Sequence, residues 1–221
     1  AIVALLILLA AIYLEHVLYE RHMNSKLAET QKQLSHYHNN MVTNLQNHIQ
    51  IVRGLPGLFA VNPELTQPQF ELAMRHLIGD HTQLRNIAAA PDMVIRYMYP
   101  IEGNEAAIGL DYRQEPAQKA AVERARMNRR LVLAGPLNLK QGGVGLITRI
   151  PVYLNDQNGQ EYFWGIISAV LDVEAFFTAS GLHAEDLSIE LAIRGRDGLG
   201  RDGEVFFGDP ELFDNPVLTM R

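Results

Sequence analysis

The chain has 221 residues, a net charge of −6 and no cysteine, and 48% of its residues are hydrophobic. The length allows one large or two small domains, and the hydrophobic fraction is ordinary for a globular chain. The lack of cysteine excludes disulfides, iron–sulfur clusters and thiol chemistry. The acidic balance argues against nucleic acid as a partner, because nucleic-acid-binding proteins usually carry a basic surplus.

An apolar run opens the chain, because residues 1–14 contain no charged or strongly polar side chain. A helix of this length covers about 21 Å, which is short of the roughly 30 Å hydrocarbon core of a bilayer. We therefore predict a transmembrane helix over residues 1–18, truncated at its N-terminal end, with Tyr13 and Tyr19 near the membrane surface. A cleaved signal peptide is the alternative, and the lack of a small-residue cleavage site after Leu14 disfavours it.

The helix is expected to continue as a stalk over residues 19–62, because neither glycine nor proline occurs before Gly54. Two rows of residues recur every seven positions: Leu27, Leu34, Met41, His48 and Leu55, and Met23, Thr30, Tyr37, Asn44 and Ile51. This weak heptad predicts a parallel homodimer. An amphipathic helix packed along its own domain explains the same residues, and the lower half can pair while the upper half packs.

The rest of the pattern predicts an α+β fold. Thr66 and Gln69 have the spacing of a capping box, so a helix begins there and ends before Gly79. Apolar runs predict strands at 84–90, 93–99, 131–139, 144–154 and 161–172, with helices at 116–130 and 172–180. Helices, two strands, a helix and a three-stranded meander follow the order of a PAS-like antiparallel sheet.

A second, smaller PAS-like unit is expected after residue 184. Strands at 187–193, 204–207 and 217–220 would begin another antiparallel sheet. We therefore divide the sheet region into a first unit at 63–184 and the start of a second at 185–221. The second unit is expected to be incomplete, because its last strand has no partner after it.

Arg149 is the main candidate for ligand binding. It is a lone cation in the apolar strand Leu146-Ile147-Thr148-Arg149-Ile150. Burying an unpaired guanidinium is expensive, so Arg149 must meet solvent, a carboxylate or an anionic ligand. Its planar fork matches a carboxylate in two hydrogen bonds. An outward-facing side chain, or one paired with Glu161 or Asp172, is the alternative.

Tyr97 and Tyr99 are further candidates, because alternation along a strand puts both rings on one face. They would wall a pocket, and ordinary sheet packing is the alternative. No metal or cofactor is expected, because His36 and His38 face nearly opposite sides of a helix and no phosphate loop or catalytic triad stands out. Arg124 belongs to a basic helix end that we interpret as solvated.

Five short segments carry a family resemblance. They are Arg85-Asn86-Ile87-Ala88, Pro100-Ile101-Glu102-Gly103-Asn104, Val122-Glu123-Arg124-Ala125-Arg126, Val132-Leu133-Ala134-Gly135-Pro136 and Gly145 through Val152. They resemble the CHASE domain, an extracytoplasmic sensor found on bacterial diguanylate cyclases, phosphodiesterases and histidine kinases and on plant cytokinin receptors. Over residues 15–221, this resemblance implies a stalk, a membrane-distal unit that binds ligand and a membrane-proximal unit.

The resemblance also implies ligand-binding positions. In the plant receptors the hormone is held by an aspartate, two threonines and a leucine, and the matching positions here are Gln118, Ala134, Lys140 and Arg149. None keeps the receptor's residue, which argues against cytokinin. A pocket with Arg149 and Lys140 would suit an anionic small molecule such as a carboxylate.

These observations lead to one functional expectation. The chain is interpreted as the sensor of a bacterial inner-membrane receptor, non-enzymatic itself, with residues from about 19 onward in the periplasm. The resemblance implies a cyclic-di-GMP enzyme or a histidine kinase as the output domain. The alternative is a membrane-anchored module for dimerisation or protein interaction that binds no small molecule.

Overall fold

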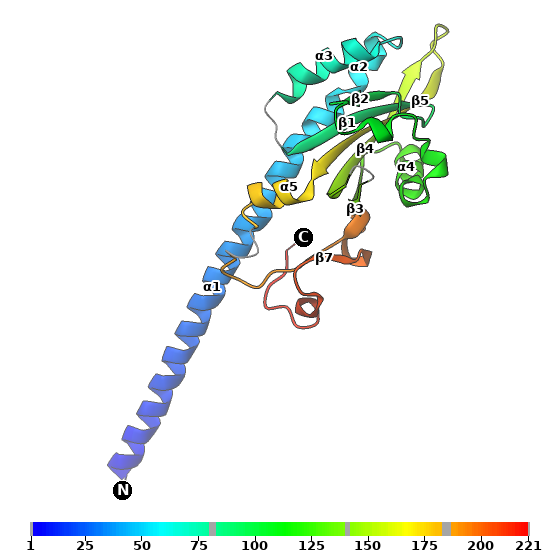
Figure 1. Cartoon of the computed structure of the whole chain (residues 1–221). Helices are drawn as coiled ribbons and strands as arrows, with labels where there is room; N and C mark the ends of the chain where they lie inside the picture. Colours follow the sequence, from blue (N-terminus) through cyan, green and yellow to red (C-terminus); the bar gives the residue numbers. More distant parts are fainter. Residues whose placement is uncertain (1, 80–82, 140–141, 183–186, 221) are drawn as a thin grey trace.

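The computed structural model describes residues 2–79, 83–139, 142–182 and 187–220. A long helix, α1 (Ile2–Gly54), leads into an α+β unit whose five strands form one antiparallel sheet in the order β2-β1-β5-β4-β3 (Figure 1). The strands are β1 (Leu84–Pro91), β2 (Tyr97–Tyr99), β3 (Val132–Asn138), β4 (Val144–Asn155) and β5 (Glu161–Asp172). The meander expected from β3 to β5 is confirmed, since each strand pairs antiparallel with the next.

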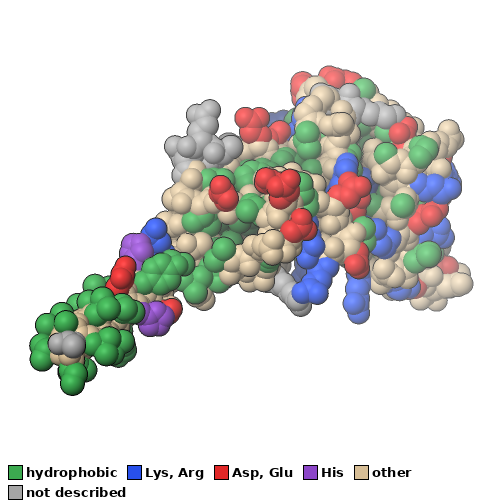
Figure 2. All heavy atoms as spheres, turned by 90° about the horizontal axis from the view of Figure 1, so that it is seen from below, with side chains coloured by type: hydrophobic (Ala, Val, Ile, Leu, Met, Phe, Trp, Pro, Cys, Tyr) green, Lys and Arg blue, Asp and Glu red, His purple; other side chains and the backbone are tan. Residues whose placement is uncertain are grey.

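Helix α1 has two halves with different surroundings. Its N-terminal part is apolar and exposed, and the span Ile2–Val61 contains a stretch of mean hydropathy 2.3, none of it buried, long enough to cross a membrane. Figure 2 shows hydrophobic side chains around this free end, with histidine and charged side chains further along. Higher up, Tyr37, Met41 and Leu45 pack against the domain, and His48 and Val52 are buried. From about Tyr37 onward, the residues of α1 that recur every seven positions therefore pack within the monomer.

Two short helices continue α1 over one face of the sheet. Helix α1 ends before Leu55, after which Pro56 begins α2 (Pro56–Val61). Helix α3 (Gln67–Ile78) begins at Thr66, and the Gln69 Oε1 accepts from the Thr66 backbone nitrogen at 2.9 Å, so the expected capping box forms. These helices and the top of α1 cover the sheet (Figure 1).

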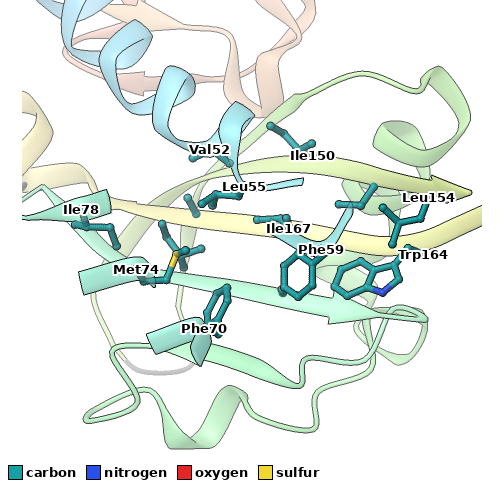
Figure 3. Close-up of a cluster of buried hydrophobic side chains, with 14 residues drawn as sticks. Val52, Leu55, Phe59, Phe70, Met74, Ile78, Ile150, Leu154, Trp164 and Ile167 are labelled. Carbon is teal, nitrogen blue, oxygen red and sulfur yellow. The ribbon is translucent and has the colours of Figure 1, made fainter. Parts of the chain in front are cut away.

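The main hydrophobic core lies between these helices and the sheet (Figure 3). Phe59 of α2 stands at its centre, with its ring 4.2 Å from the Trp164 ring of β5 and 5.3 Å from the Tyr97 ring of β2. The spacing of three and four residues puts the side chains on one face of the helices, and the residues so spaced are Val52, Leu55 and Phe59. This packing fixes the top of α1 to the sheet.

The opposite face of the sheet carries helix α4 (Pro116–Asn128) and the loops of residues 93–115, with short 3-10 helices η1 (Glu105–Ala107) and η2 (Tyr112–Gln114). A second core of small and apolar side chains lies here, including Ala88, Met98 and Val122. The strand expected over 93–99 is shorter, because Asp92 and Met93 adopt positive φ angles of 46° and 66° and turn the chain away before β2 begins.

The C-terminal region differs from the expected sheet. Among the described residues of this region, only β6 (Ile193–Arg194) and β7 (Val205–Phe207) pair, so the predictions of strands over 187–193 and 217–220 were wrong. Leu187 and Leu191 instead pack individually against the cluster around helix α5 (Val173–Ala179). The ring of Phe177 of α5 meets the Phe207 ring edge to face, with 4.9 Å between the ring centroids. This segment lies on the side of the sheet toward the N-terminal half of α1 (Figure 1).

The turn η3 (Arg196–Gly198) of the β6–β7 segment attaches to the first unit. It is followed by η4 (Gly200–Asp202), and η5 (Pro210–Phe213) follows β7. The Asp197 Oδ1 accepts a hydrogen bond from the Gly135 backbone nitrogen at 2.7 Å, and Arg124 of α4 donates to the Asp197 carbonyl oxygen at 2.7 Å. Gly135 has a φ of +99°, and a Cβ there would lie 2.6 Å from the Gly145 carbonyl oxygen, so glycine is required at this contact.

Candidate functional site

Arg149 lies on β4 with its side chain fully buried, on the face of the sheet that α4 covers. Its Nη2 donates to the Gln118 Oε1 at 2.7 Å, and its Nη1 donates to the Ser168 Oγ at 3.2 Å. Its guanidinium carbon stands 4.9 Å from the centre of the Tyr112 ring. The alternative of an outward-facing or carboxylate-paired arginine is therefore wrong for the described part of the chain, since neither Glu161 nor Asp172 contacts it.

The charge of Arg149 is poorly compensated. Among the described residues, Arg149 forms no ion pair, and its Nε has no hydrogen-bond partner. Burial lowers the pKa of Arg149, and the interactions with Tyr112 and Asp197 oppose that shift. An arginine starts from so high a pKa that it keeps its proton in proteins. The site thus holds a buried cation that forms no direct ion pair within the described part of the chain.

The floor of the site is a straight row of cross-strand partners. Met98 of β2 pairs with Ala88 of β1, Ala88 with Ser168 of β5, and Ser168 with Arg149 of β4. Direct partners in a sheet point to the same face. Because Ala88 and Ser168 in the middle of the row are small, space remains above them.

A cavity of about 40 Å³ occupies this space. A parallel row of Asn86, Val170 and Ile147 widens its floor. The remaining walls come from the loops before α4, from α4 and from the end of β3, namely Ile95, Ala107, Leu110, Tyr112, Gln118 and Leu139. A buried water needs roughly 10–15 Å³ by this measure, so the cavity has room for a few waters or a small ligand group.

Hydrogen bonds hold the polar walls in place. The Tyr112 hydroxyl and the Ser168 Oγ are 3.0 Å apart, which links the loop to β5 beside the guanidinium. The Asn86 Nδ2 donates to the Asn104 Oδ1 at 2.7 Å. These groups fix the positions of the Tyr112 ring and of the Asn86 amide, so the cavity is largely preformed.

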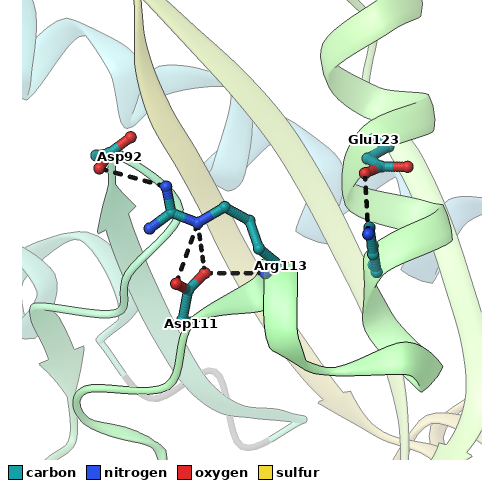
Figure 4. A network of polar contacts seen from close by, with 5 residues as sticks. Asp92, Asp111, Arg113 and Glu123 are labelled. Atoms are coloured by element: carbon teal, nitrogen blue, oxygen red, sulfur yellow. Dashed lines mark hydrogen bonds and ion pairs between the residues drawn. The ribbon is translucent and has the colours of Figure 1, made fainter.

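An ion-pair network outside the cavity positions Tyr112 (Figure 4). The Arg113 Nε donates to the Asp111 Oδ1 at 2.8 Å, and Arg113 also lies 3.5 Å from Asp92. The hydrogen bonds from Arg113 lower the pKa of Asp111. Tyr112 stands between these two residues in the sequence, so the pair holds η2 with the Tyr112 ring turned inward.

The structure brings together two of the sequence-predicted site residues, Arg149 and Gln118. Ala134 continues the second floor row beyond Ile147 and is buried, but it packs against α4 without lining the cavity. Lys140 lies outside the described residues. Tyr97 and Tyr99 pack against the main hydrophobic core on the other face of the sheet, and Met98 between them lines the cavity.

Ser168, Tyr112 and Asn86 line the cavity and were not predicted from the sequence. Ser168 had a detectable signal, because it is the lone hydroxyl within the apolar run Gly165-Ile166-Ile167-Ser168-Ala169. Asn86 had a similar signal at the start of β1. Tyr112 had none, because it lies in a loop whose path no pattern predicts. The solvated interpretation of the basic helix end holds for Arg126, Arg129 and Arg130, which are exposed, but not for Arg124, whose guanidinium donates to the Asp197 carbonyl oxygen.

Comparison with known families shows to which family the chain belongs. The profile of the CHASE domain matches residues 37–207, most of the chain. The chain belongs to the CHASE domain family. Among curated proteins, none matches this CHASE chain.

One solved structure shares the fold at low sequence identity, and two others resemble the chain more weakly. The sensory domain of the Campylobacter jejuni chemoreceptor Tlp3 superposes with a TM-score of 0.53 at 11% identity, over 89% of this chain and 78% of that domain. The V. cholerae histidine kinase DctB sensor domain gives 0.48 at 15%, over 71% and 60% of the two chains. An extracellular ligand-binding receptor from Desulfohalobium retbaense gives 0.49 at 18%, over 69% and 25%. This CHASE chain thus spans a quarter of the third protein and less than two thirds of the second.

Membership in the family has a direct consequence. This CHASE chain is the extracytoplasmic sensor portion of a signalling receptor. The apolar, unburied end of α1 fits a membrane protein whose sensor lies outside the cytoplasm. The cavity beside Arg149 lies in the α+β unit at the far end of α1 from that apolar segment (Figure 1).

Proposed function

We propose that the chain is the periplasmic small-molecule sensor of a bacterial inner-membrane receptor, and that the ligand binds in the cavity beside Arg149. The single observation that carries this proposal is the fully buried guanidinium, which forms no ion pair with any described residue. An uncompensated buried charge costs several kcal/mol. In a binding site the ligand can supply the missing negative charge. The folded state is then stabilised when the ligand is bound.

Three further features support a ligand role. The cavity is mostly apolar, with a few converging polar groups, which is the usual composition of a small-molecule site. Gln118 and Arg149 coincide with positions that the plant CHASE receptors use for their hormone. The Tlp3 domain, which shares the fold, is the sensory domain of a chemoreceptor. The membrane boundary is proposed near residue 19, shortly after the apolar run of residues 1–14 ends.

The receptor's output is proposed to be a diguanylate cyclase, a phosphodiesterase or a histidine kinase. Ligand binding would bias the position of α4 and of the segments attached to it, and α1 would carry the change to the membrane. This part of the proposal rests on the family. Cyclic-di-GMP turnover and autophosphorylation of the full-length receptor, each measured with and without ligand, would identify the output.

A thermal-shift screen of the chain in lipid nanodiscs tests the sensor function. A library of small metabolites should contain a class that raises the unfolding temperature, because a ligand that binds only the folded state stabilises it by RT ln(1 + [L]/Kd). The shift should disappear in Arg149→Gln and persist in Arg75→Gln, which removes an exposed arginine on α3. If no class produces a shift, a dimerisation or protein-interaction module becomes the better explanation.

A further inference from the structure

The polarity of the cavity narrows the class of ligand. The described residues that line it include one cation, Arg149, and no carboxylate. Its other polar groups are neutral: the amides of Asn86 and Gln118 and the hydroxyls of Tyr112 and Ser168. A buried ligand charge must meet a partner of the opposite charge. The cavity can therefore compensate a negative group on the ligand, whereas no lining group can compensate a positive one.

The hydrogen-bond inventory of Arg149 points to a carboxylate. Nη1 is bonded to Ser168, Nη2 is bonded to Gln118, and Nε has no partner among the described residues. The Nε and Nη2 hydrogens leave the guanidinium parallel to one another along one edge, which matches the two oxygens of a carboxylate. A ligand carboxylate that takes the place of the Gln118 Oε1 on Nη2 would also satisfy Nε.

The rest of the cavity is small and apolar. Eight of its lining side chains are aliphatic or methionine: Ala88, Ile95, Met98, Ala107, Leu110, Leu139, Ile147 and Val170. A volume of about 40 Å³ leaves room for a short hydrocarbon chain beside the carboxylate. A second charged group on the ligand would have to be buried without a counter-charge among the described lining residues.

We propose that the cavity binds a short-chain aliphatic monocarboxylate and discriminates against the matching α-amino acid. This inference rests on the proposed sensor function and specifies its ligand class. Propionate and alanine form the decisive pair, because they share the carboxylate and the carbon chain and differ by one ammonium group. Loss of solvation of that ammonium without a counter-charge should weaken alanine binding by at least about tenfold.

The test is isothermal titration calorimetry on the chain in nanodiscs at constant ionic strength. The probes are propionate, alanine, succinate, propionamide and inorganic phosphate. Propionate should bind, and alanine, succinate and the neutral propionamide should each bind at least about tenfold more weakly. Arg149→Gln should lose propionate binding, and Arg75→Gln should keep it.

The possible results distinguish a wrong ligand class from a wrong sensor function. If alanine or succinate binds as tightly as propionate, the ligand class is wrong and the sensor function stands. If propionamide or phosphate binds as tightly, the carboxylate fork is wrong. If propionate does not bind, while another class in the thermal-shift screen gives a shift that Arg149→Gln abolishes, only this inference fails. If no class of ligand produces a shift, both fail.

Discussion

Arg149 and Gln118 join the sheet to helix α4 through one hydrogen bond, in which the Nη2 of Arg149 donates to the Gln118 Oε1 at 2.7 Å. The amide oxygen thus occupies the position that an anionic ligand would need on the guanidinium. A ligand that binds there must displace Gln118 and so alters the contact of α4 with the sheet. The same helix reaches the β6–β7 segment through Arg124 and the Asp197 carbonyl.

Gln118→Glu places a permanent carboxylate against Arg149. We expect the unliganded variant to unfold at a temperature a few degrees higher, because the buried guanidinium gains a counter-charge, and about 1 kcal/mol shifts the midpoint of a domain of this size by a few degrees. We also expect the ligand-induced shift to disappear. Differential scanning calorimetry with and without ligand measures both effects. Gln118→Ala is the control, since it removes the competing oxygen without adding charge and should keep binding.

Arg149→Met should separate folding from binding. Replacing a buried ionic group by an apolar side chain of similar length is often neutral or stabilising. We therefore expect the unliganded variant to unfold at or above the parent's temperature while the ligand-induced shift is lost. Calorimetry of parent and variant in parallel checks this. A variant that binds as tightly as the parent would show that Arg149 is not a ligand contact.

Phe59→Ala tests the packing of the helices on the sheet. We expect the free energy of unfolding to fall by about 3–5 kcal/mol, the usual cost of removing a buried phenylalanine ring. Trp164 is the only tryptophan and its ring lies 4.2 Å from Phe59, so its fluorescence during urea unfolding reports the loss directly. Val61→Ala is the matched control on the same helix, because Val61 is 88% exposed. An equal loss in both variants would contradict the assigned core.

Asp197→Ala should release the β6–β7 segment from the first unit. The lost hydrogen bond from the Gly135 nitrogen involves a charged acceptor, for which about 1.5–3 kcal/mol is typical. Hydrogen exchange should accelerate at Gly135 and across residues 193–207. Asp202→Ala changes an exposed aspartate in the same loop and should leave exchange unchanged. Protection that survives in Asp197→Ala would mean that the hydrophobic contacts of Phe177 hold the segment alone.

The stalk remains a predicted parallel dimer in its lower half. The chain has no cysteine, so single cysteines can be placed along it without background. In membranes, cysteines at residues 20–32 should crosslink between chains with a period of about 3.5 residues. Cysteines at Tyr37, Met41 and Leu45 should crosslink poorly, because these positions pack within the monomer. A uniform profile along the whole helix would argue against a specific dimer.

Much of the fold was predictable, because the local sequence patterns agree with the secondary structure that these segments adopt in the folded protein. The apolar runs of β3, β4 and β5 and the capping box at Thr66 each specify one structure. The strand expected over 187–193 failed for a physical reason. Leu187 and Leu191 are partly buried against the cluster around α5, and hydrophobicity alone does not distinguish that contact from a strand.

The site was only partly predictable. A lone cation in an apolar strand identified Arg149, and family resemblance added Gln118. Alternation correctly put Tyr97 and Tyr99 on one face, but it cannot say which face a helix or a cavity will cover, and the structure covers theirs with the core. Ser168 depends on the register of β4 against β5, which is set by long-range pairing.

The floor of the cavity has an evolutionary consequence. In the proposed site, Arg149, which would bind the ligand carboxylate, is on β4, whereas Ala88, whose small side chain leaves the space, is on β1, with Ser168 between them. On this proposal, the strength of anion recognition and the length of the accepted carbon chain are determined by residues on separate strands. A substitution at position 88 could change which metabolite a descendant receptor detects while its affinity for carboxylates stays intact, so paralogues can acquire new signals by single mutations.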